Sequence, residues 1–83
     1  MDKLISYVIR GSLRKKVISS LTIPNTPTLL AKKINIDRGS VSRTLINLQD
    51  AGIVICSNPK NKTGRIYKLT EKGKKVYDKV RKM

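Results

Sequence analysis

Histidine, tryptophan and phenylalanine are absent from this chain of 83 residues, and cysteine occurs once. Without histidine and with one thiol, most metal sites, cysteine–histidine nucleophiles and histidine-based acid–base catalysts are excluded. We therefore expect no metal, no cofactor and no enzymatic activity. A lone cysteine cannot form an internal disulfide, which suits a reducing cytoplasm.

Long apolar runs are also lacking. No run approaches the length that crosses a bilayer, and the apolar run over residues 4–9 is interrupted by Ser6 and too short for the core of a signal peptide. We expect a cytoplasmic protein with no membrane partner, and no small-molecule ligand is evident. With three tyrosines as its only aromatic residues, the chain offers few platforms for stacking RNA bases.

Acidic residues are scarce. Five Asp and Glu stand against 19 Lys and Arg, which gives a formal net charge of +14. A chain this small and basic fits a polyanionic partner, usually nucleic acid and sometimes an anionic membrane surface. A basic surface kept only for solubility is the alternative, although acidic residues serve solubility more often. The length fits one domain, residues 1–83.

Apolar residues recur at helical spacing in the first quarter of the chain. The pattern predicts a helix over residues 2–10, and it is interrupted at Gly11 and Ser12 before it resumes from Leu13 to Leu21. The apolar stripe of the first helix consists of Leu4, Ile5, Val8 and Ile9.

Two further helices are predicted between residues 27 and 51. Thr26 before Pro27 is a helix start, because a hydroxyl caps the helix and proline needs no N–H partner at its first position. Asp37 caps a third helix that runs from residue 38 to about 51, where Gly52 stops it. The tight turn between these helices is typical of a helix-turn-helix. The buried face of the earlier helix is predicted to be Leu29, Leu30, Ala31 and Ile34.

After Gly52 the period becomes strand-like. Ile53–Cys56 and Arg65–Leu69 are β-rich and flank the polar loop Ser57–Gly64, which predicts a hairpin, or wing, over about 53–69. Thr70 caps a last helix, whose buried face is predicted to be Gly73, Val76, Tyr77, Val80 and Met83. The expected fold is α+β and mainly α: a winged helix-turn-helix with a three-helix core, a two- or three-stranded β-wing and a C-terminal helix.

The third helix has an unusual outward face. Projected at 100° per residue, Val41, Leu45 and Leu48 share one side with Thr44 at its edge, so this side is core. The outward side carries small groups, hydrogen bonders and one cation: Gly39, Ser40, Arg43 and Asn47, with Ser42 at the border and Asp50 at the far end. Arginine can donate two hydrogen bonds to guanine, asparagine pairs with adenine, and serine serves bases or phosphates. This face fits a major groove better than an ordinary solvated surface.

The hairpin is basic throughout. From Ala51 to Thr70 there is no acidic residue, while Lys60, Lys62, Arg65 and Lys68 are present. Such a loop can lie along the sugar–phosphate backbone or enter the minor groove. Cys56 lies in the first strand, where a buried cysteine is usually a small hydrophobe rather than a redox sensor.

Three strings resemble winged-helix repressors of the arsenical-resistance and multiple-antibiotic-resistance families, and small archaeal regulators related to both. Val41-Ser42-Arg43-Thr44-Leu45, with Leu48 and Ala51–Val54, is similar to their recognition helix and strand entry. Thr26-Pro27 with Leu30-Ala31 is similar to the start of their second helix, and Gly64–Gly73 to the wing strand and the entry into the last helix. The resemblance covers about residues 12–80.

The resemblance implies major-groove contacts from Ser40, Ser42, Arg43 and Asn47, and a wing around Lys60–Arg65 on the backbone or minor groove. It also implies homodimers on pseudo-palindromic sites. The chain lacks the metal-binding residues of the arsenical sensors and the long extra helices of the antibiotic-resistance group. The full set of candidate DNA-binding residues is Arg38, Gly39, Ser40, Ser42, Arg43 and Asn47 in the third helix, Asn58, Lys60, Asn61, Lys62 and Arg65 in the wing, and Thr26 and Thr28 at the start of the second helix.

The function predicted from these residues is sequence-specific binding of double-stranded DNA by a transcriptional regulator, with helix 38–51 in the major groove and wing 57–65 on the backbone or minor groove. Such a protein would be nucleoid-associated. Dimer contacts would come from the first helix or from the exposed part of the last. One alternative is an architectural, chromatin-like protein that coats DNA without reading its sequence. Another is a protein-interaction module, for which Ile46 is the candidate apolar contact on the third helix.

Overall fold

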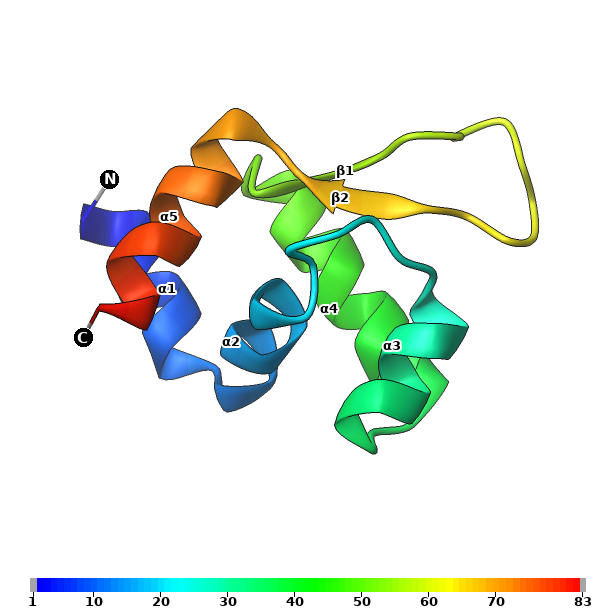
Figure 1. Cartoon of the computed structure of the whole chain (residues 1–83), viewed down its shortest axis with the longest axis horizontal. Coiled ribbons are helices and arrows are strands. Elements are labelled where there is room, and N and C mark those ends of the chain that lie inside the picture. The colour runs from blue at the N-terminus through cyan, green and yellow to red at the C-terminus, as the bar shows by residue number, and fades with distance from the viewer. Residues whose placement is uncertain (1, 83) are drawn as a thin grey trace.

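The computed structural model describes residues 2–82, with Asp2 described for its backbone alone. Over these residues the chain forms five helices and two strands (Figure 1). They are α1 (Asp2–Arg10), α2 (Ser12–Ser19), α3 (Pro27–Ile34), α4 (Arg38–Asp50), β1 (Val54–Cys56), β2 (Tyr67–Leu69) and α5 (Glu71–Arg81). The mainly helical α+β prediction is confirmed. No helix within residues 2–82 is both long enough and apolar enough to cross a membrane.

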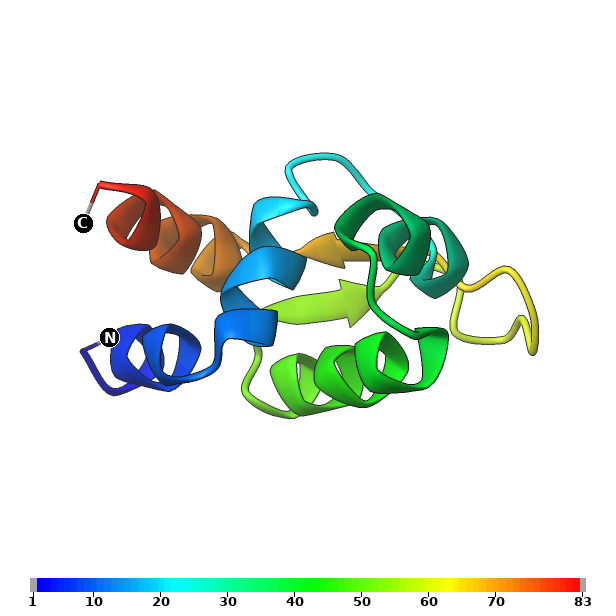
Figure 2. The ribbon, with the colours of Figure 1, turned by 90° about the horizontal axis from the view of Figure 1, so that it is seen from below.

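The core forms where α2, α3 and α4 pack together under the small sheet, with α1 and α5 side by side at one end (Figures 1 and 2). Burial of aliphatic side chains from every helix holds this arrangement. The fully buried set includes Val8 of α1, Val17 and Ile18 of α2, Leu30 of α3, Val41, Leu45 and Leu48 of α4, and Val76 of α5.

The predicted helix starts are confirmed by capping hydrogen bonds. Thr26 Oγ1 accepts from the Leu29 N–H at 3.2 Å, and Asp37 Oδ2 accepts from the Ser40 N–H at 2.9 Å. Thr70 Oγ1 accepts from the Gly73 N–H at 2.9 Å and starts α5 in the same way. Such caps satisfy N–H groups that have no partner within the helix. Asn35, with a positive φ of 57°, ends α3 in the left-handed conformation.

Several predicted details are wrong, because tertiary packing decides them. Leu29 was assigned to the core but is 54% exposed, since α3 turns Leu30 and Ala31 toward α4. In the apolar stripe of α1, Val8 is fully buried within the chain and Ile9 is 43% exposed, so Val8 is not available for the dimer contact expected of the first helix. Ile34 and Tyr77 are half-buried rather than buried. The two strands begin at Val54 and Tyr67 rather than at Ile53 and Arg65. The expectation for Met83 lies outside the described residues.

The wing is a two-stranded antiparallel hairpin. Its register pairs Val54 with Leu69, Ile55 with Lys68 and Cys56 with Tyr67, so that Ile55 and Lys68 point outward while their neighbours are buried. Asn25 adds an isolated bridge, because its N–H and C=O bond to the C=O and N–H of Tyr67 at 3.0 and 2.8 Å. The predicted two or three strands are thus two strands and one bridge. The loop between the strands reaches beyond α3 and α4 (Figure 1).

The base of the wing is fixed against α5 at Gly73. A Cβ atom on this residue would overlap the carbonyl oxygen of Ile53, so the close approach requires glycine. Thr70 Oγ1 adds a hydrogen bond to the carbonyl of Gly52 at 2.7 Å. Gly52 itself has a positive φ of 80°, as its predicted role as a helix stop requires. These contacts orient the wing relative to α4.

Candidate nucleic-acid interface

A groove of about 470 Å³ runs between the start of α3, one flank of α4 and the wing loop. It collects residues from three separate segments of the chain, because the hairpin folds back beside the helix pair (Figure 2). Six of the candidate residues line it: Thr26, Thr28, Arg38, Ser42, Lys62 and Arg65. The groove therefore has a rim of hydroxyl groups and cations.

Helix α4 presents two different sides to solvent. Arg38, Ser42 and Ile46 follow one another at intervals of four residues and line the groove. Arg43 and Asn47 are exposed on the adjoining side, away from the residues that line the groove, together with Gly39. One side thus faces the wing, and the other stands clear for contacts to a ligand that meets α4 directly.

Arg43 is part of a chain of hydrogen bonds that begins at the cap of α4. Ser40 Oγ donates to Asp37 Oδ1 at 2.8 Å, and Arg43 Nη2 donates to Ser40 Oγ at 3.4 Å. The backbone N–H of Ser40, and then its hydroxyl, hold the pKa of the Asp37 carboxyl below its ordinary value. The Ser40 hydroxyl is therefore already used within the protein. Because it lies between Asp37 and Arg43 in this series of hydrogen bonds, the hydroxyl can position the Arg43 side chain.

Asn58 organises the wing loop from within. Its Oδ1 accepts from the Ile66 N–H at 2.7 Å and its Nδ2 donates to the Gly64 carbonyl at 3.1 Å. The Cys56 thiol also donates to Asn58 Oδ1 at 3.5 Å. The amide was predicted to face a ligand, but these bonds span the loop from one strand to the other. Asn58 thus shapes the wing.

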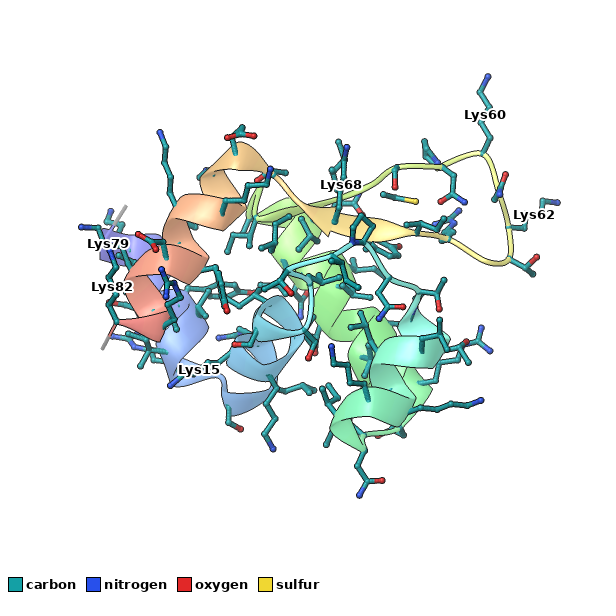
Figure 3. The ribbon with its side chains drawn as sticks, viewed as in Figure 1. Lys15, Lys60, Lys62, Lys68, Lys79 and Lys82 are labelled. Carbon is teal, nitrogen blue, oxygen red and sulfur yellow. The ribbon has the colours of Figure 1, made fainter. Side chains whose placement is uncertain are left out.

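The tip of the wing is formed by free cations. Lys60 and Lys62 project outward from the loop (Figure 3). Arg65 is partly held, because its Nε donates to the carbonyl of Asn61 at 2.8 Å. Both Arg65 and Asn61 are exposed. Like the rest of the wing, the tip has no acidic residue to neutralise it.

Positive charge extends well beyond this interface. Residues 26–70 hold eight Lys and Arg and two Asp, so +6 of the net +14 lies there and +8 lies on the remaining residues. On α5, Glu71 pairs with Lys74 at 3.4 Å, and Asp78 pairs with Arg81 and Lys82 at 3.0 and 3.2 Å. Hydrogen bonds from Lys82 and Arg81 hold the pKa of Asp78 below its ordinary value. The acids of α5 are thus neutralised locally.

Two apolar residues of the groove were missed as members of the interface. Leu29 and Ile46 both line it, and they are 54% and 53% exposed. Sequence reasoning placed Leu29 in the core and considered Ile46 only as a contact for a protein partner. The spacing of Ile46 four residues after Ser42 is the signal that would have placed it on the groove side.

A helix-turn-helix whose second helix leads into an antiparallel hairpin, with a groove between them, defines the winged-helix class. The chain belongs to the winged helix-turn-helix family, which matches residues 15–83. This confirms the family resemblance drawn from the sequence. No curated protein sequence matches the chain at a significant level.

Solved structures similar to this chain are regulators of the multiple-antibiotic-resistance type. The oxidised form of MarR from Escherichia coli is 30% identical over 82% of this chain and 50% of its own, with a TM-score of 0.72. The wild-type apo form of the same protein is 27% identical over 98% of this chain and 65% of its own, with a TM-score of 0.78. A MarR family transcriptional regulator from Silicibacter pomeroyi DSS is 26% identical over 98% of this chain and 56% of its own, with a TM-score of 0.75. The chain spans half to two thirds of the length of these relatives.

Proposed function

We propose that the chain is a transcriptional regulator that binds double-stranded DNA sequence-specifically, with α4 in the major groove and the wing on the adjoining backbone or minor groove. The observation that carries this is the groove between α4 and the wing, which gathers Arg38, Ser42, Lys62 and Arg65 from distant parts of the sequence. One sugar–phosphate strand would pass through it, because that strand separates the two DNA grooves that the helix and the wing would enter.

Each candidate residue has a role in this arrangement. Arg43 and Asn47, exposed and away from the groove lining, contact base edges, and Gly39 permits close approach. Hydroxyl groups and cations of the groove contact phosphates: Thr26, Thr28, Arg38, Ser42 and Arg65. Lys62, which also lines the groove, contacts phosphate there, and Lys60 and Asn61 contact the backbone beyond it. Ser40 positions Arg43, and Asn58 positions the wing.

The proposal includes a cytoplasmic homodimer, as the family resemblance implies. Helices α1 and α5 pack against each other at the end remote from the wing, where Leu4 and Ile5 are half-buried and Ile9 is 43% exposed. These side chains are available to a second copy, whereas Val8 is fully buried within the chain and is not. Sedimentation with and without DNA measures the state, and a monomer in both cases would contradict this part.

Selection of bound duplexes from a random pool tests the main proposal. We expect enrichment of one sequence, with two half-sites whose separation is close to a helical turn of about 34–36 Å or a multiple of it. The variant Arg43→Ala serves as the matched control and should enrich a less defined sequence from the same pool. A wild-type pool that stays random after repeated rounds would contradict sequence-specific binding.

The excess charge outside the interface favours a second candidate function, the coating of DNA without reading its sequence. The residues outside 26–70, most of which lie on α1, α2 and α5, carry a net charge of +8 on surfaces that the α4–wing interface does not use. Comparison of affinities for random and selected duplexes across a salt series separates the two functions. Equal affinities at every salt concentration favour coating, and a preference that persists as salt rises favours sequence reading.

A further inference from the structure

Two large aliphatic side chains are left open within an interface of cations and hydroxyl groups. Leu29 is 54% exposed and Ile46 is 53% exposed, and both line the groove between α4 and the wing. Arg38, Lys62 and Arg65 line the same groove. Apolar surface gains nothing from a phosphate, so these two residues fit a different part of the same ligand.

Both residues lie on elements that would meet DNA. Ile46 stands one helical turn beyond Ser42 and two beyond Arg38, on the flank of α4 that faces the wing. Leu29 is the third residue of α3, and its N–H is held by the cap at Thr26. Helices α3 and α4 pack against each other, so Leu29 and Ile46 belong to one surface although 17 positions separate them.

We propose that Leu29 and Ile46 form a binding subsite for the C5-methyl group of thymine, so that the preferred DNA sequence carries thymine where it meets this flank of α4. The inference rests on the proposed function. The thymine methyl is the apolar group that the major groove displays, and aliphatic or aromatic side chains recognise it by contact. Cations beside the subsite hold the phosphates, and the aliphatic pair then contributes base preference.

A protein partner is a less fitting occupant of this surface. Protein-binding patches on soluble proteins are contiguous apolar areas of several hundred Å² as a rule. Here two aliphatic residues stand within a groove whose lining includes three cations and no acidic side chain, so a polyanion complements it better.

Replacement of single thymines by deoxyuridine tests the subsite, because this change removes the methyl group and leaves the base-pairing edge intact. The selected duplex is the probe, with each thymine replaced in turn. We expect wild-type affinity to fall about fourfold at one or two positions, as for the loss of one buried methyl group. Ile46→Ala and Leu29→Ala should bind the thymine and uracil duplexes equally at those positions.

Ile55→Ala is the matched control. Ile55 is a similarly exposed aliphatic residue at 46%, but it lies on the outer face of β1 and does not line the groove. This variant should keep the full preference for thymine. Ile46→Val, which shortens the side chain by one carbon, should keep part of it. Circular dichroism melts of all variants establish that they fold.

The outcomes separate this inference from the function on which it rests. If wild-type protein binds the selected duplex and no uracil replacement alters its affinity, the subsite is wrong and DNA binding stands. The subsite would also be overturned if Ile46→Ala lost the same factor of affinity, relative to wild type, on the thymine and the uracil duplex. The preference for thymine would then survive without the side chain, which would assign Ile46 to sugar contacts. If Ile46→Ala changes self-association instead of DNA affinity, the flank is a protein contact. Failure of wild-type protein to bind any duplex would overturn the proposed function itself.

Discussion

Arg43 combines exposure with a partly fixed direction, since its guanidinium donates to Ser40, which in turn donates to Asp37. A side chain fixed in this way loses less freedom when it binds. We predict that Arg43→Ala costs about 1–3 kcal/mol of binding free energy on the preferred duplex and relaxes the preference at one base pair. Anisotropy titrations against duplexes with single-base changes measure both effects.

Arg43→Lys is the control for charge. Lysine keeps the phosphate attraction but lacks the forked donor geometry, so it should restore affinity for all sequences without restoring the preference. A uniform loss of affinity in Arg43→Ala across every single-base change would instead assign Arg43 to a phosphate.

Asn58 carries a prediction about order in the wing. Asn58→Ala removes the acceptor of the Ile66 N–H and the donor to Gly64, so the loop should lose its fixed shape. We expect faster amide exchange at Ile66 and weaker DNA binding, with little change in the thermal midpoint, because the loop is exposed. Asn61→Ala is the matched variant and should leave exchange at Ile66 unchanged. Equal exchange in both variants would contradict this role.

At the scale of the element, the start of α4 depends on an ionised carboxyl group. The folded pKa of Asp37 lies below its ordinary value of 3.8, so the stability it contributes is present above that value and is lost as pH falls through the folded pKa. Asp37→Asn should weaken the acid dependence of the thermal midpoint between about pH 5 and pH 2, because asparagine caps a helix without titrating. Asp78 also has a lowered pKa, so wild type and variant must be compared at each pH.

The junction of α5 with the wing depends on Gly73. Gly73→Ala would force a Cβ atom onto the Ile53 carbonyl, which is backbone and has no rotamer to adopt. We predict a loss of about 1–3 kcal/mol or more in the free energy of unfolding, measured with urea. Lys75→Ala changes an exposed residue of the same helix and should stay within about 0.5 kcal/mol of wild type. A stable Gly73→Ala protein would mean that α5 packs less closely than described.

An element can be predicted from the sequence when the contacts that determine it lie close together along the chain. The caps at Thr26, Asp37 and Thr70 act over three residues, so the sequence alone placed them. The exposure of Leu29 depends on which flank of α3 meets α4, a contact that the helical pattern of α3 does not specify. The internal roles of Ser40 and Asn58 also escaped prediction, because a polar side chain suits solvent, ligand or loop equally well until its partners are placed.

At the scale of the whole molecule, the charge distribution predicts a salt dependence. Helix α4 and the wing together carry six cations: Arg38, Arg43, Lys60, Lys62, Arg65 and Lys68. A plot of the logarithm of affinity against the logarithm of salt concentration should therefore fall with a slope no steeper than about 5. Lys62→Ala should weaken binding to all sequences and reduce the slope by about 1. Lys79→Ala, at the opposite end of the molecule (Figure 3), should leave it unchanged. A wild-type slope far above this limit would indicate that α1, α2 and α5 also engage DNA.

The reach of the wing also bears on how fast a complex forms. The molecule extends 33 Å along its longest axis, and Lys60 and Lys62 project from one end of it (Figure 3). Uncompensated cations at such a tip steer diffusing partners before short-range contacts exist. We therefore expect the wing lysines to govern the association rate and its decline with salt, and the contacts of α4 to govern the residence time. Capture of DNA from solution and retention of the bound DNA would then depend on different elements of one small domain, the wing and α4.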